Sequence, residues 1–284
     1  MRGRHNRQQI AGHHNTQAIQ VTGLQSCDPV RRTPWGTIIV AEEAGATGGL
    51  YELIDPVSIN APINVSDRAA GTTSDPNHLV KRKAVASLSF ESFAIGHDGT
   101  MIYGDELGLS NGNAGGSLYK FVPTVPYLGT GQPPITQPQL SPLASGTVFG
   151  LRVAANGSSN WGQGAEVGKG RWIAIDTAAA GVVDDNGNII LRNAQALQKF
   201  TGYYRPEDMD VDPIAASNGV LRACWANTGR LNFAGGRRRL APKIRRGDRD
   251  VECTVIHGAC HSRFARSVMQ YVADLAFTNQ CSRS

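Results

Sequence analysis

The chain has 284 residues and a formal net charge of +5, and it is rich in glycine (33) and proline (14). Only 18% of its residues are charged, so many turns and few long exposed helices are expected. No stretch approaches the roughly 20 apolar residues of a transmembrane helix, and the composition also excludes a collagen and a coiled coil.

The positive charge is concentrated at the two ends of the chain. Residues 230–284 hold eleven Lys and Arg against four Asp and Glu, whereas residues 8–229 are net negative. A nucleic-acid-binding protein needs positive charge on the folded surface that follows the phosphates, so no nucleic-acid partner is expected. We predict a disordered basic N-terminus (1–20), a β domain (21–229) and a basic tail (230–284) that is irregular or helical.

Short apolar runs bounded by Gly, Pro, Asn and Asp recur along the body, as is typical of β-strands. The predicted strands are Trp35–Ala41, Gly49–Ile54, Ser87–Ile95, Thr100–Gly104, Ser117–Val122, Thr147–Ala154, Arg171–Ile175, Asn188–Leu191, Asp208–Val211 and Val220–Ala226. Asn193–Phe200 has helical spacing, and the prolines between Pro123 and Pro142 predict an extended loop.

Short strands without alternating helices predict an all-β fold. The repeating order of strand, turn, aromatic strand and long loop favours a β-propeller. At about four strands per blade, the predicted strands suffice for only part of a propeller. A β-sandwich is the alternative that could be closed at this size.

Several acidic residues stand at the ends of predicted strands, and Glu91 lies within an apolar one. They are Glu42, Glu43, Glu91, Asp105, Glu106 and Glu207. Carboxylates that converge repel one another and call for a cation. Oxygen ligands suit a hard cation such as calcium, whereas a thiolate such as that of Cys27 adds affinity for a transition metal. Taken singly, each acid also fits a solvated corner, and Cys27 fits a small buried side chain.

The segment from Cys27 to Glu43 reads CDPVRRTPWGTIIVAEE. It resembles the Cys…Thr-Pro-Trp-Gly-Thr…Glu-Glu signature of the PhoX-type alkaline phosphatase family. Further segments resemble later motifs of that family in the same order; they are Ser89–Ser92, Ile102–Glu106 with Gly116–Pro123, and Arg205–Asp208. The resemblance covers about residues 24–230. Phe90 stands where the family has His, and the pattern fades after Gly229, so an incomplete member is expected.

The resemblance implies a six-bladed β-propeller that hydrolyses phosphate monoesters with iron and calcium. It implies a periplasmic or secreted protein, although this chain contains no export signal. Cys27 would bind iron and act in catalysis, and Arg205 would bind the substrate phosphate and act in catalysis. The implied metal-binding carboxylates are Glu42, Glu43, Glu91, Asp105, Glu106 and Glu207. The expected partner is a small phosphate ester, bound by a monomer.

Two other functions remain open from the sequence. A non-catalytic, calcium-stabilised propeller module is favoured by Phe90 and by the early end of the pattern. Lactone hydrolysis is the other, because other calcium-containing propellers hydrolyse lactones. Neither Gly-x-Ser-x-Gly nor His-Glu-x-x-His occurs, which removes the commonest serine-hydrolase and zinc-protease signals.

Overall fold

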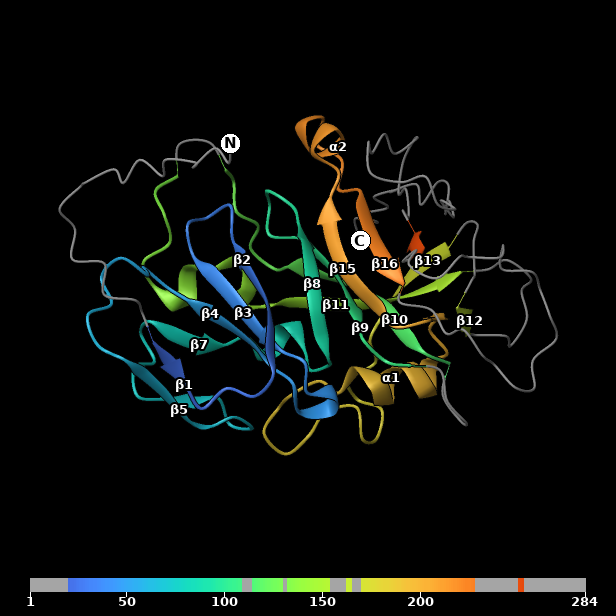
Figure 1. The fold of residues 1–284 in the computed structure, drawn as a ribbon, viewed down its shortest axis with the longest axis horizontal. Helices are drawn as coiled ribbons and strands as arrows, with labels where there is room; N and C mark the ends of the chain where they lie inside the picture. The colour runs from blue at the N-terminus through green and yellow to red at the C-terminus, as the bar shows by residue number, and fades with distance from the viewer. Residues whose placement is uncertain are drawn as a thin grey trace, which may run out of the picture.

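A computed structural model describes residues 20–108, 114–129, 132–153, 162–164, 170–227 and 250–252. The predicted basic N-terminus, up to residue 19, and the predicted tail, apart from Asp250–Glu252, lie outside these residues. The described part of the chain is mostly β, with several antiparallel sheets, two α-helices and no closed barrel (Figure 1). The all-β prediction is therefore confirmed, while the organisation into propeller blades stays a prediction.

Two sheets contain most of the strands. The four-stranded sheet has the order β2-β3-β4-β7, formed by β2 (Cys27–Arg32), β3 (Ile38–Glu42), β4 (Leu50–Leu53) and β7 (Leu79–Lys81). In the seven-stranded sheet, β8 pairs with β9, β9 pairs with β10, and the rest follow the order β12-β14-β10-β11-β13. Its strands are β8 (Phe90–Ile95), β9 (Met101–Asp105), β10 (Gly116–Pro123), β11 (Gly146–Val153), β12 (Gly162–Gly164), β13 (Gly170–Ala174) and β14 (Gly202–Tyr203).

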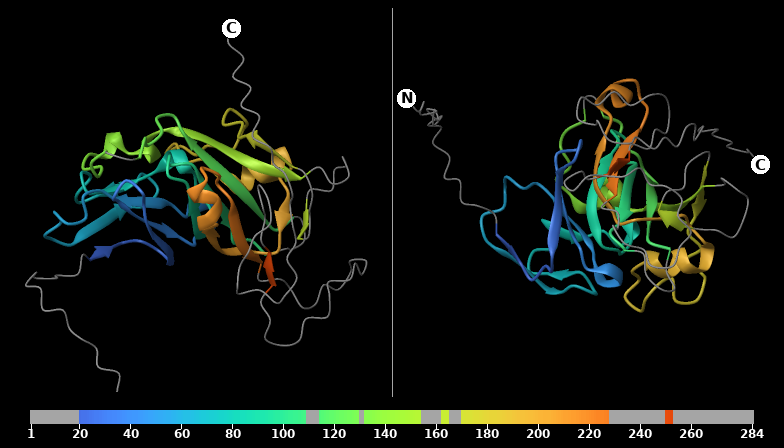
Figure 2. Two further views of the ribbon diagram at one scale, coloured as in Figure 1. Left: turned by 90° about the horizontal axis from the view of Figure 1, so that it is seen from above. Right: turned by 45° about the vertical axis from the view of Figure 1, so that its right-hand side comes forward.

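Smaller sheets and two short helices complete the described fold. One sheet contains β15 (Pro206–Val211), β16 (Ala223–Asn227) and β17 (Asp250–Glu252), and another contains β1 (Val21–Thr22), β5 (Ile63–Asp67) and β6 (Thr72–Thr73). The helices are α1 (Leu191–Gln198) and α2 (Pro213–Ser217). Strands β2, β8 and β15 belong to three different sheets but lie side by side, so these sheets follow one another across the molecule (Figures 1 and 2).

Most of the predicted elements are present. Each predicted strand overlaps a strand of the structure except Asn188–Leu191, which forms isolated bridges before α1 begins. The predicted helix Asn193–Phe200 corresponds to α1, which ends where Lys199 adopts the left-handed conformation. Strand β2 was not predicted, because Pro29 and its charged residues hide the apolar alternation on which such a prediction depends.

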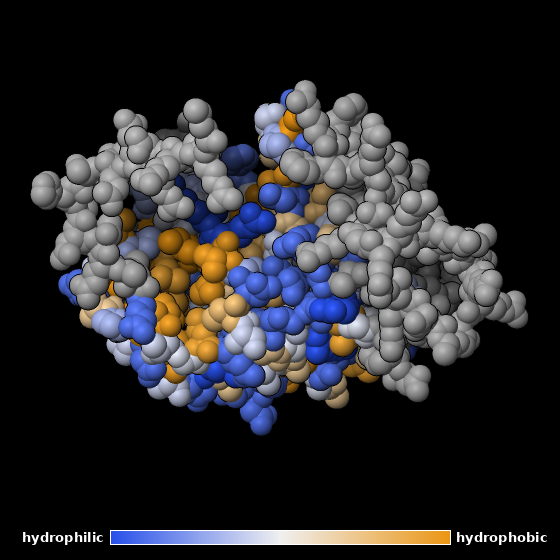
Figure 3. Space-filling model, in the orientation of Figure 1, coloured by the Kyte–Doolittle hydropathy of each residue, from blue (hydrophilic) through white to orange (hydrophobic). Residues whose placement is uncertain are grey.

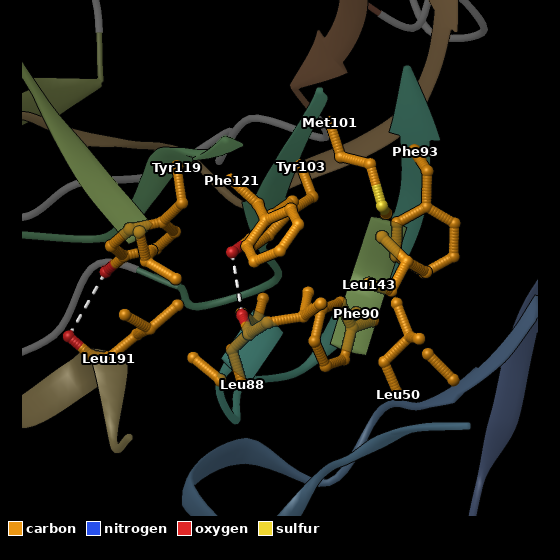
Figure 4. Close-up of a cluster of buried hydrophobic side chains, with 14 of the residues drawn as sticks. Leu50, Leu88, Phe90, Phe93, Met101, Tyr103, Tyr119, Phe121, Leu143 and Leu191 are labelled. Carbon is orange, nitrogen blue, oxygen red and sulfur yellow. Dashed lines mark hydrogen bonds between the residues drawn. The ribbon is translucent and has the colours of Figure 1, made fainter. Parts of the chain in front are cut away.

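The main core is aromatic and lies between the sheets (Figure 4). Phe90 packs against Phe93 and Tyr103, with ring centroids 5.6 and 5.7 Å apart. The hydroxyl of Tyr103 donates to the Val85 carbonyl at 2.7 Å, so the polar end of this buried ring is satisfied. Burial of each such side chain contributes about 1.5–3 kcal/mol. The core thus fixes β8, the strand that carries Glu91.

An apolar surface lies over the four-stranded sheet. Apolar side chains gather on the face formed around β2 to β4 (Figure 3), where Val30 is 59% exposed. Ile38 and Val40 of the same region are partly buried against a small core that contains Tyr51 and Leu53. Within the described residues, no helix has the length and apolar character needed to cross a membrane.

Glu52 is a fully buried carboxylate that holds the Trp-Gly-Thr segment in place. Its oxygens accept hydrogen bonds from Trp35 Nε1 at 2.7 Å and from Thr37 Oγ1 at 2.5 Å. Arg82 Nε donates to the other oxygen at 2.6 Å, and Ser141 Oγ lies 2.8 Å from it. The most distinctive motif of the sequence therefore has a structural role here, in a turn anchored to a buried ion pair.

Glu52→Gln should destabilise the protein by about 3–5 kcal/mol, because it leaves the buried Arg82 guanidinium without a counter-charge. The free energy of unfolding from urea titration checks this expectation. Asp185→Asn, at an exposed position, is the matched control and should change little. A loss below about 1 kcal/mol in Glu52→Gln would show that the pair is not needed for stability.

Lys120 is a buried lysine on β10 of the seven-stranded sheet. Its ammonium lies over the rings of Phe149 and Trp172, 5.1 and 5.2 Å from their centroids. Burial lowers the pKa of Lys120 to about 8. Between that pH and the ordinary lysine value of about 10.4, the unfolded chain binds more protons than the folded one, so this lysine makes stability rise with pH.

The melting temperature of the wild type relative to Lys120→Met should therefore rise from about pH 7.5 to about pH 10. Thermal unfolding followed by circular dichroism at several pH values measures it. Lys83→Met controls for the loss of one lysine charge. A difference that is constant across this range would contradict the lowered pKa of Lys120.

Candidate metal centre

Three carboxylates from different segments converge at one end of β2 and β8. Asp28, Glu43 and Glu91 each offer an oxygen, and these oxygens all lie within 4.8 Å of one another. Asp28 is exposed, while Glu43 and Glu91 are half-buried. We call these three residues the acidic cluster. Its donors are all carboxylate oxygens, which is the ligand chemistry of a hard cation such as calcium.

Backbone contacts place the members of the acidic cluster. Glu43 directly follows β3, and its N–H donates to the Ser26 carbonyl at 2.8 Å, which brings it beside the start of β2. Glu43 also forms an isolated bridge with Ser89, just before β8. Ser26 has a φ of 47°, a left-handed conformation that costs energy for a residue with a side chain. The chain thus holds a strained turn at the point where Asp28 enters the cluster.

Arg31 and Ser92 tie together the three strands that surround the cluster. Arg31 Nη2 on β2 donates to the Met209 carbonyl of β15 at 2.9 Å and to Ser92 Oγ of β8 at 3.3 Å. Ser92 Oγ in turn donates to the same Met209 carbonyl at 2.7 Å. These contacts connect strands of three separate sheets, and they fix how β15 approaches the acidic cluster.

Glu91 experiences the strongest electrostatic effect in the cluster. Burial, then a hydrogen bond with Asp28 and the charges of Asp28, Glu43 and Glu207, raises the pKa of Glu91 to about 8. A carboxyl in this position keeps its proton at neutral pH unless a positive charge replaces it. A cation held by the three residues would supply that charge.

Arg205 lies between two of the sequence-predicted carboxylates, Glu106 just after β9 and Glu207 on β15. Its Nη2 pairs with Glu207 at 3.2 Å and also contacts the buried Glu106. Arg205 itself is exposed and has a left-handed φ of 51°. Gly104 permits this approach, because a Cβ there would lie 2.7 Å from Pro206 Cβ. The motifs Tyr-Gly-Asp-Glu and Arg-Pro-Glu-Asp are thus brought together in space.

Glu42 and Asp105 are fully buried, and each already forms an ion pair with an arginine. Glu42 binds Arg68 Nε at 2.6 Å and accepts from the backbone N–H groups of Gln25 and Gly49. Asp105 accepts from Arg192 Nε at 2.8 Å and Nη2 at 2.9 Å. Burial raises the pKa of Asp105, and Arg192 opposes this effect. The structure does not bring these two carboxylates into the acidic cluster.

Cys27 also lies outside the acidic cluster. Its thiol is close to Glu42 and Arg68, and partial burial raises its pKa, with Glu42 adding to the rise and Arg68 opposing it. The acidic cluster offers only oxygen ligands, which suit a hard cation, and iron binding by Cys27 stays a prediction.

Sequence reasoning missed the residues that complete these groups. Asp28 directly follows Cys27 in the motif, so it could have been predicted as a ligand from the sequence. It does not lie next to another carboxylate, as Glu42 and Glu43 do, and it was therefore missed. Arg192 and Arg68 carried no such signal, because they pair with Asp105 and Glu42 from 87 and 26 residues away.

Comparisons with known proteins give one distant structural match. No family model matches the sequence, and no curated protein matches it. A solved structure of Pseudomonas fluorescens PhoX in complex with vanadate, a transition state analogue, is similar with a TM-score of 0.46 and 19% identity. The match covers 71% of this chain and 39% of that one, so this chain spans about two fifths of the length of that structure.

Calcium should raise the melting temperature of the protein, because a ligand at 100 times its dissociation constant stabilises the folded state by about 2.7 kcal/mol. Thermal unfolding with and without calcium, after treatment with a chelator, measures the shift. Glu91→Gln and Glu43→Gln should abolish it, whereas Asp185→Asn and Cys27→Ala should keep it. A calcium shift that survives in both Gln variants would place the cation elsewhere.

Proposed function

We propose that the protein is a calcium-dependent phosphatase that hydrolyses phosphate monoesters, with its three neighbouring sheets arranged as propeller blades. The observation that carries the proposal is the convergence of Asp28, Glu43 and Glu91, with Arg205 paired to Glu207, whose charge acts on Glu91. A cation and an arginine close together form a pair suited to a phosphate dianion. The resemblance of the segments that hold these residues to PhoX-type motifs adds to it.

Each residue has a defined part in this proposal. Asp28, Glu43 and Glu91 hold the cation, which when bound would neutralise negative charge on the phosphoryl group. Arg205 binds the phosphoryl oxygens with guanidinium N–H groups, since Arg presents five donors in a planar fork. Glu106 and Glu207 orient that guanidinium. Periplasmic or secreted location and a monomeric state belong to the same proposal.

Arg205→Lys should lower kcat/KM for p-nitrophenyl phosphate by about 10²–10³-fold, because one lysine ammonium cannot reproduce the planar fork. The assay measures phosphate release with calcium present, with Asp185→Asn as the control. The calcium-induced rise in melting temperature should be unchanged in Arg205→Lys, which separates loss of catalysis from loss of the cation. Equal kcat/KM in the two variants would exclude Arg205 from the reaction.

A specific observation favours a second candidate, a non-catalytic module stabilised by calcium. Phe90 is fully buried and packs into the aromatic core, so the position that carries His in the PhoX-type family points away from any polar site. A calcium-dependent rise in melting temperature without hydrolysis of phosphate esters would select this candidate. Hydrolysis of lactones but not phosphate esters would instead indicate an esterase of another class.

A further inference from the structure

A Ser–His–Asp arrangement lies on the far edge of the four-stranded sheet from the acidic cluster. Ser58 follows β4, and Asp75 and His78 precede β7, whereas β2 is at the opposite edge of the sheet. The Ile54 N–H donates to the His78 carbonyl at 2.8 Å, and Leu53 pairs with Leu79. The two segments are therefore held in a fixed relation by the sheet itself.

The side chains are aligned as nucleophile, base and orienting acid. Ser58 Oγ lies 3.0 Å from His78 Nε2, and His78 Nδ1 lies 2.7 Å from Asp75 Oδ2. The other carboxylate oxygen of Asp75 accepts from the backbone N–H groups of Asn77 and His78 at 3.2 and 3.3 Å. The carboxylate is thus anchored before it contacts the imidazole, which is the role of the third member of such a triad.

The proton positions follow from the donors and acceptors. The Asp75 carboxylate accepts the Nδ1–H, so the neutral imidazole presents the lone pair of Nε2 toward Ser58. The Ser58 hydroxyl then donates to Nε2. Its oxygen also lies 2.9 Å from the Asp55 carbonyl, which is a second acceptor for the same proton. This carbonyl can take up the hydroxyl hydrogen bond whenever His78 carries two protons.

The arrangement is open to a small molecule from solvent. Ser58 is exposed, and the His78 and Asp75 side chains are 29% and 36% exposed. The turn from Asp55 to Ser58 is closed by the Ser58 N–H, which donates to the Asp55 carbonyl at 3.0 Å. Val57, the residue before Ser58 on this turn, is 94% exposed and offers an apolar side chain to a bound molecule.

We propose that Ser58 is a nucleophile activated by His78 and Asp75, and that it takes acyl groups from small activated esters. A bond forms between Ser58 Oγ and the ester carbonyl carbon, while the bond from that carbon to the leaving oxygen breaks. The hydroxyl proton passes to His78 Nε2 and then to the leaving alkoxide or phenolate. Water, deprotonated by the same nitrogen, hydrolyses the acyl-serine and releases the carboxylic acid.

Ser58 lacks the Gly-x-Ser-x-Gly context, and this is compatible with the proposal because such triads are recognised by geometry rather than by sequence position. An aryl ester suits an exposed site, since a phenolate departs with little assistance. The substrate class is therefore a small apolar acyl group on a good leaving group, with the acyl part resting near Val57.

Incubation of the full chain with p-nitrophenyl acetate tests the proposal, with p-nitrophenol release and peptide mass spectrometry as the two readouts. Acetylation is expected at Ser58 and should be absent in Ser58→Ala. His78→Gln should slow it by about 10²-fold, the usual contribution of a general base. Asp75→Asn should slow it at least about tenfold, because Nδ1–H loses the charge that holds its orientation.

Ser66→Ala is the matched control, since Ser66 is also exposed and its hydroxyl donates to the Thr72 carbonyl at 3.4 Å, with no imidazole bonded to it among the described residues. In this variant, Ser58 should be acetylated by p-nitrophenyl acetate at the wild-type rate. Melting temperatures establish that each variant is folded. Acetylation of Ser58 at the same rate in the wild type and in His78→Gln would overturn the proposal, as would no acetylation of Ser58 above that of Ser66.

Discussion

A carboxylate removed from water needs a positive partner, and this constraint distinguishes the fully buried carboxylates of the protein from the acidic cluster. Glu42, Glu52 and Asp105 are fully buried, and each is paired with an arginine from a distant part of the chain. The acidic cluster has no such ion pair among the described residues. The buried ion pairs stabilise the fold, whereas a cation from solution can supply the missing positive charge at the acidic cluster.

This division changes the meaning of the sequence motifs. Glu42 and Glu43 are adjacent, yet successive residues at the end of a strand point to opposite sides, so one is buried against Arg68 and the other joins the acidic cluster. At the start of β2, Asp28 likewise joins the acidic cluster while the adjacent Cys27 does not. Of these four neighbouring residues, only Glu42 is buried in an ion pair, while Asp28 and Glu43 are possible ligands.

The sequence predicts those features of the fold and the site that depend on interactions between nearby residues. Strand identity depends on alternation over a few residues, so β3, β4 and β8 to β11 were found, and turn chemistry located the loop after Pro123. The pairing of a carboxylate with an arginine depends on the whole fold. Nothing near Asp105 in the sequence indicates that Arg192 neutralises it, and only Asp28, beside Cys27, could have been added from the motif itself.

The link from Arg31 to the Met209 carbonyl spans 178 residues, and it has a consequence for how the protein reaches its native state. Contacts of such long sequence separation form slowly, because a large loop must close before they contribute. During synthesis on the ribosome, β2 emerges early, but its hydrogen bond to β15 cannot form until β15 has been made. The contacts that β15 makes around Asp28 therefore cannot form before residue 209 has been synthesised, whereas the pairing of β2 with β3 needs only the first part of the chain.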